Sequence, residues 1–440
     1  MVTPHELVPQ PSADRAAWHD ALQAGDTGRL VALAEHDAPG ASLLEIETFI
    51  NGLYRGVAMS GAPSGATDAA FRRVAAAHSV AQALRRSLGW QVRHFDLELL
   101  RMIRRSSALS AVLGAGVSMG AGGPSWAKLV RRLLETTLER GIEFRAPVSR
   151  STHTREDGTE ELSVTYGVVE TRRYDDAQRR QAESVLEAVR RDGSATDVEA
   201  LMQGAQLCLD LCGQELFRLL TTELYGPMKA PSATHRAIAA LAHAQPVPSR
   251  GPGAWPGWDT IVTYNFDSLM SEALAESRVP HAAYAARKGG MGIDPDPLAR
   301  DGDWHVPVLH LHGYTPRRLF RITDTHFVFS TSQYAQAYGG ERLPMLDQVV
   351  DRVLANPVHV ALYIGCSFAD EAMNGLLARA FARWPGRYHY AFLQWPHARL
   401  DAEPSPEAVQ AEAERYLAFG VRPVWFDDFA ELPAMVEALA

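Results

Sequence analysis

The spacing of apolar residues along the chain alternates between a helical period and short continuous runs. Residues 14–105 place apolar side chains three and four positions apart, in segments such as SLLEIETFINGLYRGVAM and FDLELLRMIRR. This is the period of one face of an α-helix. Residues 174–245 return to that period, for example in DVEALMQGAQLCLDLC and ATHRAIAALAHA. The pattern predicts helices in both stretches.

Short apolar runs that end in glycine or polar residues lie between and after the helical stretches. They are ALSAVLGAG from residue 108, DTIVTYN from 259, VPVLHLHG from 306, VHVALYIG from 358, and near the C-terminus YHYAFLQ and RPVWFD. Near-continuous apolar runs are typical of strands that are buried on both faces, as in parallel sheets covered by helices. The sequence therefore predicts an α/β fold with a Rossmann-like, mostly parallel sheet and helices on both faces.

These patterns divide the chain into two predicted domains. Residues 1–105 form a helical N-terminal domain, and residues 106–440 form the α/β domain. A hairpin and helical insertion interrupts the second domain at about 143–250. The pair Asp157-Gly158 lies between β-prone runs and is typical of a hairpin turn, so it predicts the hairpin.

Composition and charge are those of an ordinary folded protein. Apolar residues make up 46% of the sequence and charged residues 22%, which is the balance of a globular chain. The formal net charge is −9, so no overall basic field indicates direct nucleic-acid binding. The N-terminal residues lack a signal-peptide pattern, and no apolar stretch is long enough to span a bilayer. We therefore expect a cytoplasmic protein that does not bind a membrane.

The three cysteines do not indicate a metal site or a disulfide framework. Cys208 and Cys212 lie four residues apart in a helical pattern. They would supply only two of the four ligands of a structural zinc site, so we expect them to be core residues, and we expect no zinc. Cys366 lies in a turn-like segment without an activating base that the sequence reveals, and we assign it no catalytic role.

Polar residues and glycines gather where four of the predicted strands end. The segments are GAGVS, TYNFD, HLHG and GCSFAD. Ligands of open α/β sheets bind outside the carboxyl ends of the strands, so we expect these four exits to converge on one crevice. Gly114 and Gly116 permit a close approach of the backbone to a diphosphate, although a glycine turn can also serve only for packing.

The order of these motifs resembles that of the sirtuin superfamily. The matching residues are GAGVS at 114–118, Gly122, Pro124, Trp126, TYNFD at 263–267, HLHG at 310–313 and GCSFAD at 365–370. The chain looks most like the sirtuin-like NAD⁺ hydrolases of bacterial anti-phage defence, over roughly residues 106–430. The resemblance implies a sirtuin-like NAD-binding domain and an NAD⁺ glycohydrolase (NADase) that releases nicotinamide and ADP-ribose. It further implies an NAD-depleting effector of an abortive-infection system.

The resemblance also assigns roles to single residues. It implies that Asn265 and His312 are the catalytic pair. The residues that it implies for binding NAD⁺, which is the substrate, are Gly114, Ala115, Gly116, Ser118, Trp126, Thr263, Asp267, Gly365 and Ser367. An asparagine amide can orient a water or a ribose hydroxyl without bringing charge, and a histidine can accept its proton near neutral pH.

More ordinary roles stay open for the same residues. Asn265 can be a turn residue that closes a strand, and Asp267 can cap the helix that follows it. His310 and His312 would share one face of an extended strand, so either can be a core histidine. Gly313 directly after His312 favours His312 as the site residue.

Two departures from the protein-deacylating sirtuins favour water as the acceptor. Those enzymes carry a four-cysteine zinc ribbon after the HG segment, whereas no cysteine lies between His312 and Cys366. Ala127 stands where their GIPxFR motif has an arginine. Two alternatives to hydrolysis remain, a catalytically silent sensor of NAD⁺ or ADP-ribose and an ADP-ribosyltransferase.

The resemblance implies partners as well. Members of the family act as homo-oligomers and with proteins encoded beside them, such as a HerA-type ATPase or a short Argonaute. This chain contains neither a Walker-type phosphate loop nor an Argonaute-sized region. We expect a homo-oligomer with a HerA-type ATPase or another defence-system partner.

Overall fold

The computed structural model describes most of the chain from residue 109 onward. The described residues are 97, 100, 104, 109–154, 160–191, 198–242, 257–287, 290–295, 305–317, 327–338, 346, 349–356, 359–383, 388–395 and 406–440. The predicted helical N-terminal domain, residues 1–105, therefore lies almost wholly outside the described residues.

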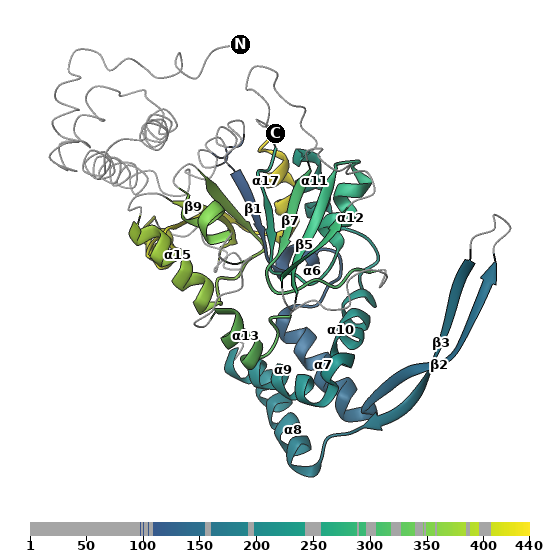
Figure 1. Ribbon diagram of the computed structural model, residues 1–440. Coiled ribbons are helices and arrows are strands. Elements are labelled where there is room, and N and C mark those ends of the chain that lie inside the picture. The colour runs from purple at the N-terminus through teal and green to yellow at the C-terminus, as the bar shows by residue number, and fades with distance from the viewer. Residues whose placement is uncertain are drawn as a thin grey trace, which may run out of the picture.

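An eight-stranded sheet forms the centre of the described structure (Figure 1). Its order is β10-β9-β8-β1-β4-β7-β5-β6, and all neighbours are parallel except the antiparallel pair β5 and β6. The strands are β1 (Leu109–Leu113), β4 (Ile261–Thr263), β5 (His281–Arg287), β6 (Gly290–Pro295), β7 (Val306–His310), β8 (Val360–Ile364), β9 (His389–Gln394) and β10 (Val421–Phe426). The predicted parallel sheet and its six predicted strands are confirmed, whereas β5 and β6 were not predicted.

Helices cover both faces of this sheet, as predicted. One face packs against α11 (Ala233–Ala242), α12 (Leu269–Glu276) and α17 (Leu432–Glu437). The other packs against η4 (Val350–Leu354), α15 (Glu371–Arg383) and α16 (Pro406–Leu417). Along β1, Ala111 belongs to the first core and its neighbour Val112 to the second. Successive residues are therefore buried on opposite faces, which explains why the strand sequences are apolar without alternation.

A layer of helices with its own apolar core lies at the carboxyl end of the sheet (Figure 1). Its helices are α7 (Trp126–Arg140), α8 (Asp176–Arg191), α9 (Val198–Cys212) and α10 (Leu216–Tyr225). Phe266 and Leu269, which follow β4, belong to the same core. The predicted insertion at about 143–250 contributes α8 to α10, whereas α7 precedes those limits and α11 packs on the sheet.

The two cysteines of α9 lie in the core of this helical layer. Cys208 and Cys212 are both fully buried. Burial raises the pKa of the Cys208 thiol to about 12, so it stays protonated and behaves as an apolar group. The predicted core role of the two residues is confirmed.

A two-stranded antiparallel ribbon projects from the helical layer (Figure 1). Its strands are β2 (Ile142–Thr154) and β3 (Glu160–Arg172). At the base of the ribbon, Phe144 packs against the core of the helical layer, and the guanidinium of Arg172 lies 4.2 Å from the Phe144 ring centroid. The predicted Asp157-Gly158 turn at its tip falls outside the described residues.

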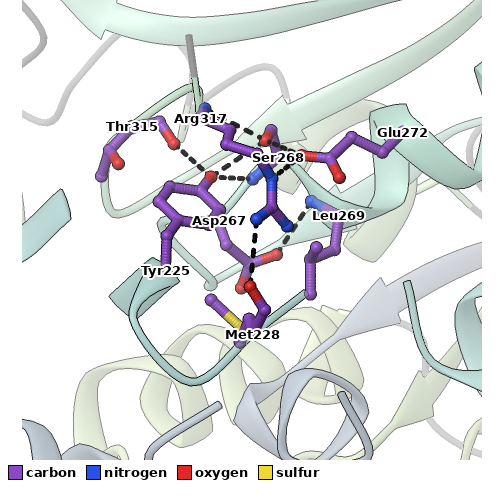
Figure 2. A network of polar contacts seen from close by, with 8 residues as sticks. All are labelled: Tyr225, Met228, Asp267, Ser268, Leu269, Glu272, Thr315 and Arg317. Atoms are coloured by element: carbon purple, nitrogen blue, oxygen red, sulfur yellow. Dashed lines mark hydrogen bonds and ion pairs between the residues drawn. The ribbon is translucent and has the colours of Figure 1, made fainter. Parts of the chain in front are cut away.

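Figure 2 shows how the last helix of this layer is joined to the sheet. The hydroxyl of Tyr225, the last residue of α10, donates to the carbonyl of Thr315 (2.6 Å) and accepts from the backbone N–H of Ser268 (2.7 Å). Arg317 lies over the Tyr225 ring, 4.7 Å from its centroid, and pairs with Glu272 of α12 at 3.1 Å. These directional contacts hold α10 against the loops after β4 and β7.

Within the parts of the chain described above, no helix has both the length and the apolar composition that are needed to cross a membrane.

Candidate active site

The loops that follow β1, β4, β7 and β8 are joined by hydrogen bonds. Gly116 donates from its N–H to the Gly365 carbonyl (2.9 Å), and the Asn265 side chain donates to the Gly114 carbonyl (2.9 Å). His310 Nδ1 lies 3.0 Å from the Asn265 carbonyl. β1 occupies the middle of the sheet with β4 and β8 on either side, which is where open α/β sheets form their ligand crevice. The predicted convergence of the strand exits is confirmed.

The glycines of two loops allow their backbones to touch. A Cβ on Gly114 would lie 2.5 Å from the Gly365 carbonyl oxygen, and a Cβ on Gly116 would lie 2.8 Å from the Gly365 Cα. Gly365 has φ +69°, and a Cβ there would lie 2.6 Å from the Val117 nitrogen. The N–H groups of Gly116 and Val117 already donate to backbone carbonyls. Packing against the β8 loop is thus one definite role of this glycine turn.

Replacing Gly365 with Ala is expected to lower the free energy of unfolding by on the order of 3 kcal/mol, because strain at positive φ adds to a backbone clash. Gly213→Ala is the matched control, since Gly213 also has positive φ (+53°) but has open space around its Cβ position. That control should cost only about 1 kcal/mol of backbone strain. Urea unfolding of the two variants measures the difference, and equal losses would contradict the close-packed loops.

Asn265 follows β4, and its amide is held in one orientation. Nδ2 donates to the carbonyl of Gly114 and to Oγ of Ser118 (3.0 Å). Because a carbonyl can only accept, the atom that faces Gly114 must be the nitrogen. The backbone N–H of Asn265 donates to Oγ1 of the buried Thr263 (3.0 Å). Thr263 therefore supports Asn265, whose remaining polar side-chain atom is the acceptor Oδ1.

Asp267 supports Asn265 through Ser118. It is 4% exposed, and Oδ2 accepts from the Ser118 hydroxyl (2.7 Å) while Oδ1 accepts from the N–H of Leu269 (3.0 Å) at the start of α12. Burial raises the pKa of the Asp267 carboxyl, and the donors Ser118 and Leu269 oppose that shift. Asp267 therefore holds the first N–H group of α12, although the N-cap residue of this helix is Ser268 and not Asp267 as the predicted alternative had it. Asp267 also fixes Ser118 between itself and Asn265.

His310 is the last residue of β7 and is fully buried beneath the site. Its Nδ1 donates to the Asn265 carbonyl, because that oxygen can only accept. Burial lowers the pKa of His310 to about 4, so the ring is neutral at physiological pH. Of the two histidines in HLHG, His310 is thus the core residue that holds the backbone of the β4 loop.

Acid is expected to destabilise the fold through His310. Its pKa is about 6.5 in the unfolded chain and is lowered to about 4 in the folded protein. The contribution of the neutral His310 ring to the free energy of unfolding is therefore fully present above about pH 6.5. On the order of 3 kcal/mol of it is lost as the pH falls towards about 4. Urea unfolding at several pH values tests this. The variant His310→Gln should show a shallower slope between these pH values, and an unchanged slope would contradict the assignment.

His312 lies in the turn after β7, half-buried among tyrosines. Its Nε2 is 2.8 Å from the Tyr338 hydroxyl, and the Tyr264 ring packs edge-on at 4.9 Å between centroids. Tyr334 lies next to Tyr338, and its hydroxyl donates to Asp370. Burial lowers the pKa of His312 to about 4, while the Asp370 carboxylate opposes this shift. The imidazole is therefore neutral at physiological pH and can accept a proton.

The other predicted site residues lie around these loops. Ala115 begins the short helix α6 (Ala115–Met119). Trp126 begins α7, and its ring packs edge-on against Phe329 at 4.8 Å, so it is partly buried against the core of the helical layer. Ser367 is exposed in the loop after β8, where its Oγ accepts from the Ala369 N–H (3.4 Å). The contacts of Trp126 give it a packing role in this structure.

Cys366 and Asp370 both lie in the loop after β8. Burial raises the pKa of the Cys366 thiol to about 12, which disfavours the thiolate. Asp370 caps α15, since its Oδ1 accepts from the Met373 N–H (2.9 Å). Among the residues that the structure describes, no group of three or more His, Cys, Asp or Glu side chains is placed to hold a metal ion.

Sequence reasoning did not single out the two tyrosines of α13 (Thr331–Tyr338). Tyr334 and Tyr338 lie four residues apart in TSQYAQAY and so share one face of this helix. That spacing was visible in the sequence. What the sequence lacked was any indication that this face meets His312, which precedes Tyr338 by 26 residues.

The region that contains Asn265 and His312 is similar to a known domain family. Residues 259–417 match the family model of the SIR2-like domain. The match begins just before β4 and ends in the last turn of α16, so it does not include the glycine turn after β1. It supports the resemblance to the sirtuin superfamily and is compatible with an NAD⁺-dependent activity. The comparison with curated proteins gave no match.

Proposed function

We propose that the protein is an NAD⁺ glycohydrolase that acts where the exits of β4 and β7 meet. One observation carries the proposal. A rigidly oriented amide, Asn265, and a neutral imidazole, His312, follow neighbouring parallel strands within the region that matches the SIR2-like domain. NAD⁺ is the substrate.

The reaction needs an acceptor for one proton and an orienting group for water. The bond between nicotinamide and C1′ of the ribose breaks, and its electron pair leaves with nicotinamide, which becomes neutral. Water attacks the oxocarbenium-like C1′, forms the new C–O bond and loses a proton. Asn265 Oδ1 accepts a hydrogen bond from the attacking water, and His312 takes the proton and passes it to solvent. The products are nicotinamide, ADP-ribose and a proton.

Four buried side chains support the orientation of Asn265. Thr263 and His310 hold its backbone, and Ser118 holds its amide against Asp267. Pre-organised polar groups contribute most to catalysis when they need no rearrangement during the reaction. The candidate residues Thr263, Ser118 and Asp267 thus serve the reaction by fixing Asn265.

The biological role that we propose is depletion of NAD⁺ in a bacterial anti-phage, abortive-infection response. This rests on the resemblance of the motifs to those of the sirtuin-like defence effectors. The same resemblance supports a homo-oligomer with a HerA-type ATPase or another defence-system partner. Co-expression with the neighbouring gene product should change the NAD⁺ turnover.

The direct test is to incubate the purified chain with NAD⁺, with and without its neighbouring gene product, and to separate the products by chromatography. Equal amounts of nicotinamide and ADP-ribose are expected, and the double variant Asn265→Ala/His312→Ala should release neither. Tight NAD⁺ binding without nicotinamide release would replace the proposal with a sensor. Label from NAD⁺ on a macromolecule would replace it with an ADP-ribosyltransferase.

A further inference from the structure

Tyr338 contacts the proposed base directly, although none of the sequence motifs includes it. It is the last residue of α13, and its hydroxyl lies 2.8 Å from His312 Nε2. The two rings are perpendicular, with their centroids 6.0 Å apart. The contact is therefore made by the hydroxyl at the edge of the imidazole, which is a hydrogen-bonding geometry.

We propose that Tyr338 is a positioning residue that fixes the orientation and the tautomer of His312. Its hydroxyl oxygen accepts a hydrogen bond from the Nε2–H group, so Nδ1 keeps the lone pair that receives the proton from the attacking water. This inference rests on the proposed NAD⁺ cleavage. It adds Tyr338 of α13 to that proposal, as a residue that acts on His312.

The helix that carries Tyr338 is itself held in place. α13 begins with a reciprocal cap, in which Gln333 Oε1 accepts from the N–H of Ser330 (3.2 Å) and Ser330 Oγ accepts from that of Gln333 (3.4 Å). Gln206 of α9 accepts from the N–H of Ser332 (3.1 Å). The Tyr334 ring packs on Tyr338 at 4.6 Å between centroids. The Tyr338 hydroxyl thus approaches His312 from a helix that is anchored to the helical layer.

A neutral imidazole has one N–H and one lone pair, so a partner at one nitrogen decides the role of the other. The groups that surround His312 in the described structure are Tyr264 after β4, Tyr334 and Tyr338 on α13, and Asp370 before α15. Burial raises the pKa of the Tyr338 hydroxyl, which therefore stays protonated and uncharged. An uncharged oxygen can accept a hydrogen bond from Nε2–H without favouring the imidazolium form of His312, as a charged acceptor would.

The variant Tyr338→Phe keeps the ring and removes the hydroxyl. The kcat for nicotinamide release should fall about 10- to 100-fold, as for other groups that orient a catalytic histidine, while the KM for NAD⁺ changes by less than about twofold. The acid limb of the pH profile of kcat should move to lower pH, because the imidazolium loses a hydrogen-bond acceptor.

Tyr284→Phe is the matched control. The Tyr284 hydroxyl of β5 lies 2.8 Å from Nε2 of His305, which precedes β7, so the variant removes the same kind of hydrogen bond at the amino end of β7, whereas His312 follows its carboxyl end. Its kinetics should equal those of the wild type. Equal turnover in Tyr338→Phe and Tyr284→Phe would overturn the inference. A faster Tyr338→Phe, or an acid limb that moves to higher pH, would also overturn it.

A wild-type protein that releases no nicotinamide would instead contradict the proposed function, and the inference then has its own test. Protein labelled with ¹⁵N-histidine reports the tautomer of each imidazole, and the His312 signals are assigned with His312→Gln. The Nε2–H tautomer is expected in the wild type, and a shifted balance is expected in Tyr338→Phe. Identical His312 signals in both proteins would overturn the inference.

Discussion

Replacing His312 with Gln is expected to lower the kcat for nicotinamide release by about 100- to 10,000-fold, the range that general acid–base catalysis contributes. Glutamine can still form a hydrogen bond to the Tyr338 hydroxyl, which lies 2.8 Å from His312 Nε2, but it cannot accept a proton from water. The KM for NAD⁺ should change much less, because the substituted group acts on the attacking water. Chromatographic initial rates at saturating NAD⁺ measure the effect.

A matched control for this variant is His281→Gln. His281 is also buried, but it begins β5 at the amino end of the strands, where its Nδ1 lies 2.9 Å from the Val279 carbonyl, whereas His312 follows the carboxyl end of β7. The same change of side chain there should leave kcat unaltered in the folded protein. Wild-type turnover in His312→Gln would show that another group takes the proton.

Replacing Asn265 with Asp is expected to be as damaging as replacing it with Ala, each lowering kcat about 100- to 1000-fold, which is typical for the loss of one pre-organised polar group. Aspartate has nearly the same shape, but it presents an oxygen instead of Nδ2 to the Gly114 carbonyl, which is 2.9 Å away. Two acceptors at this distance repel each other, so the side chain turns out of its oriented position. Steady-state kinetics of both variants test the prediction.

Gln394→Glu controls for the amide-to-carboxylate change. Gln394 ends β9, and its Nε2 donates to the Asp427 carbonyl (3.0 Å) at an exposed position away from Asn265. This variant should keep wild-type kcat. If Asn265→Asp retained turnover while Asn265→Ala lost it, an acceptor oxygen would be all that the reaction requires, and the oriented Nδ2 contacts would be unimportant.

The sheet was predictable where burial on both faces dictates the side chains. β1, β4, β7 and β8 are apolar at nearly every position because each lies between two helix-covered cores. β5 was missed because its sequence, HAAYAAR, is rich in alanine, which favours helices. Only its place between β7 and β6 and the packing of Ala283 and Ala285 against Tyr314 make it a strand.

The sequence motifs predicted which residues are candidates for the site, but not how their side chains are arranged. The order of the strand exits singled out Asn265 and His312 as candidate site residues, and the structure brings their segments together at adjacent exits. The direction in which each neighbouring side chain faces was not predictable. Asp267 is buried against Ser118, and Trp126 packs against the core of the helical layer.

By itself, the sequence determined the α/β class, the order of the strand exits and the residue types there, because these follow from local apolar period and from motif spacing. Tertiary structure alone decided which of these groups touch. Gly116 meets Gly365, and Tyr338 of α13 meets His312, across long stretches of chain. Such contacts depend on the order of the strands in the sheet and on the packing of the helices at the carboxyl ends of the strands. Neither produces a periodic pattern of apolar residues in the sequence.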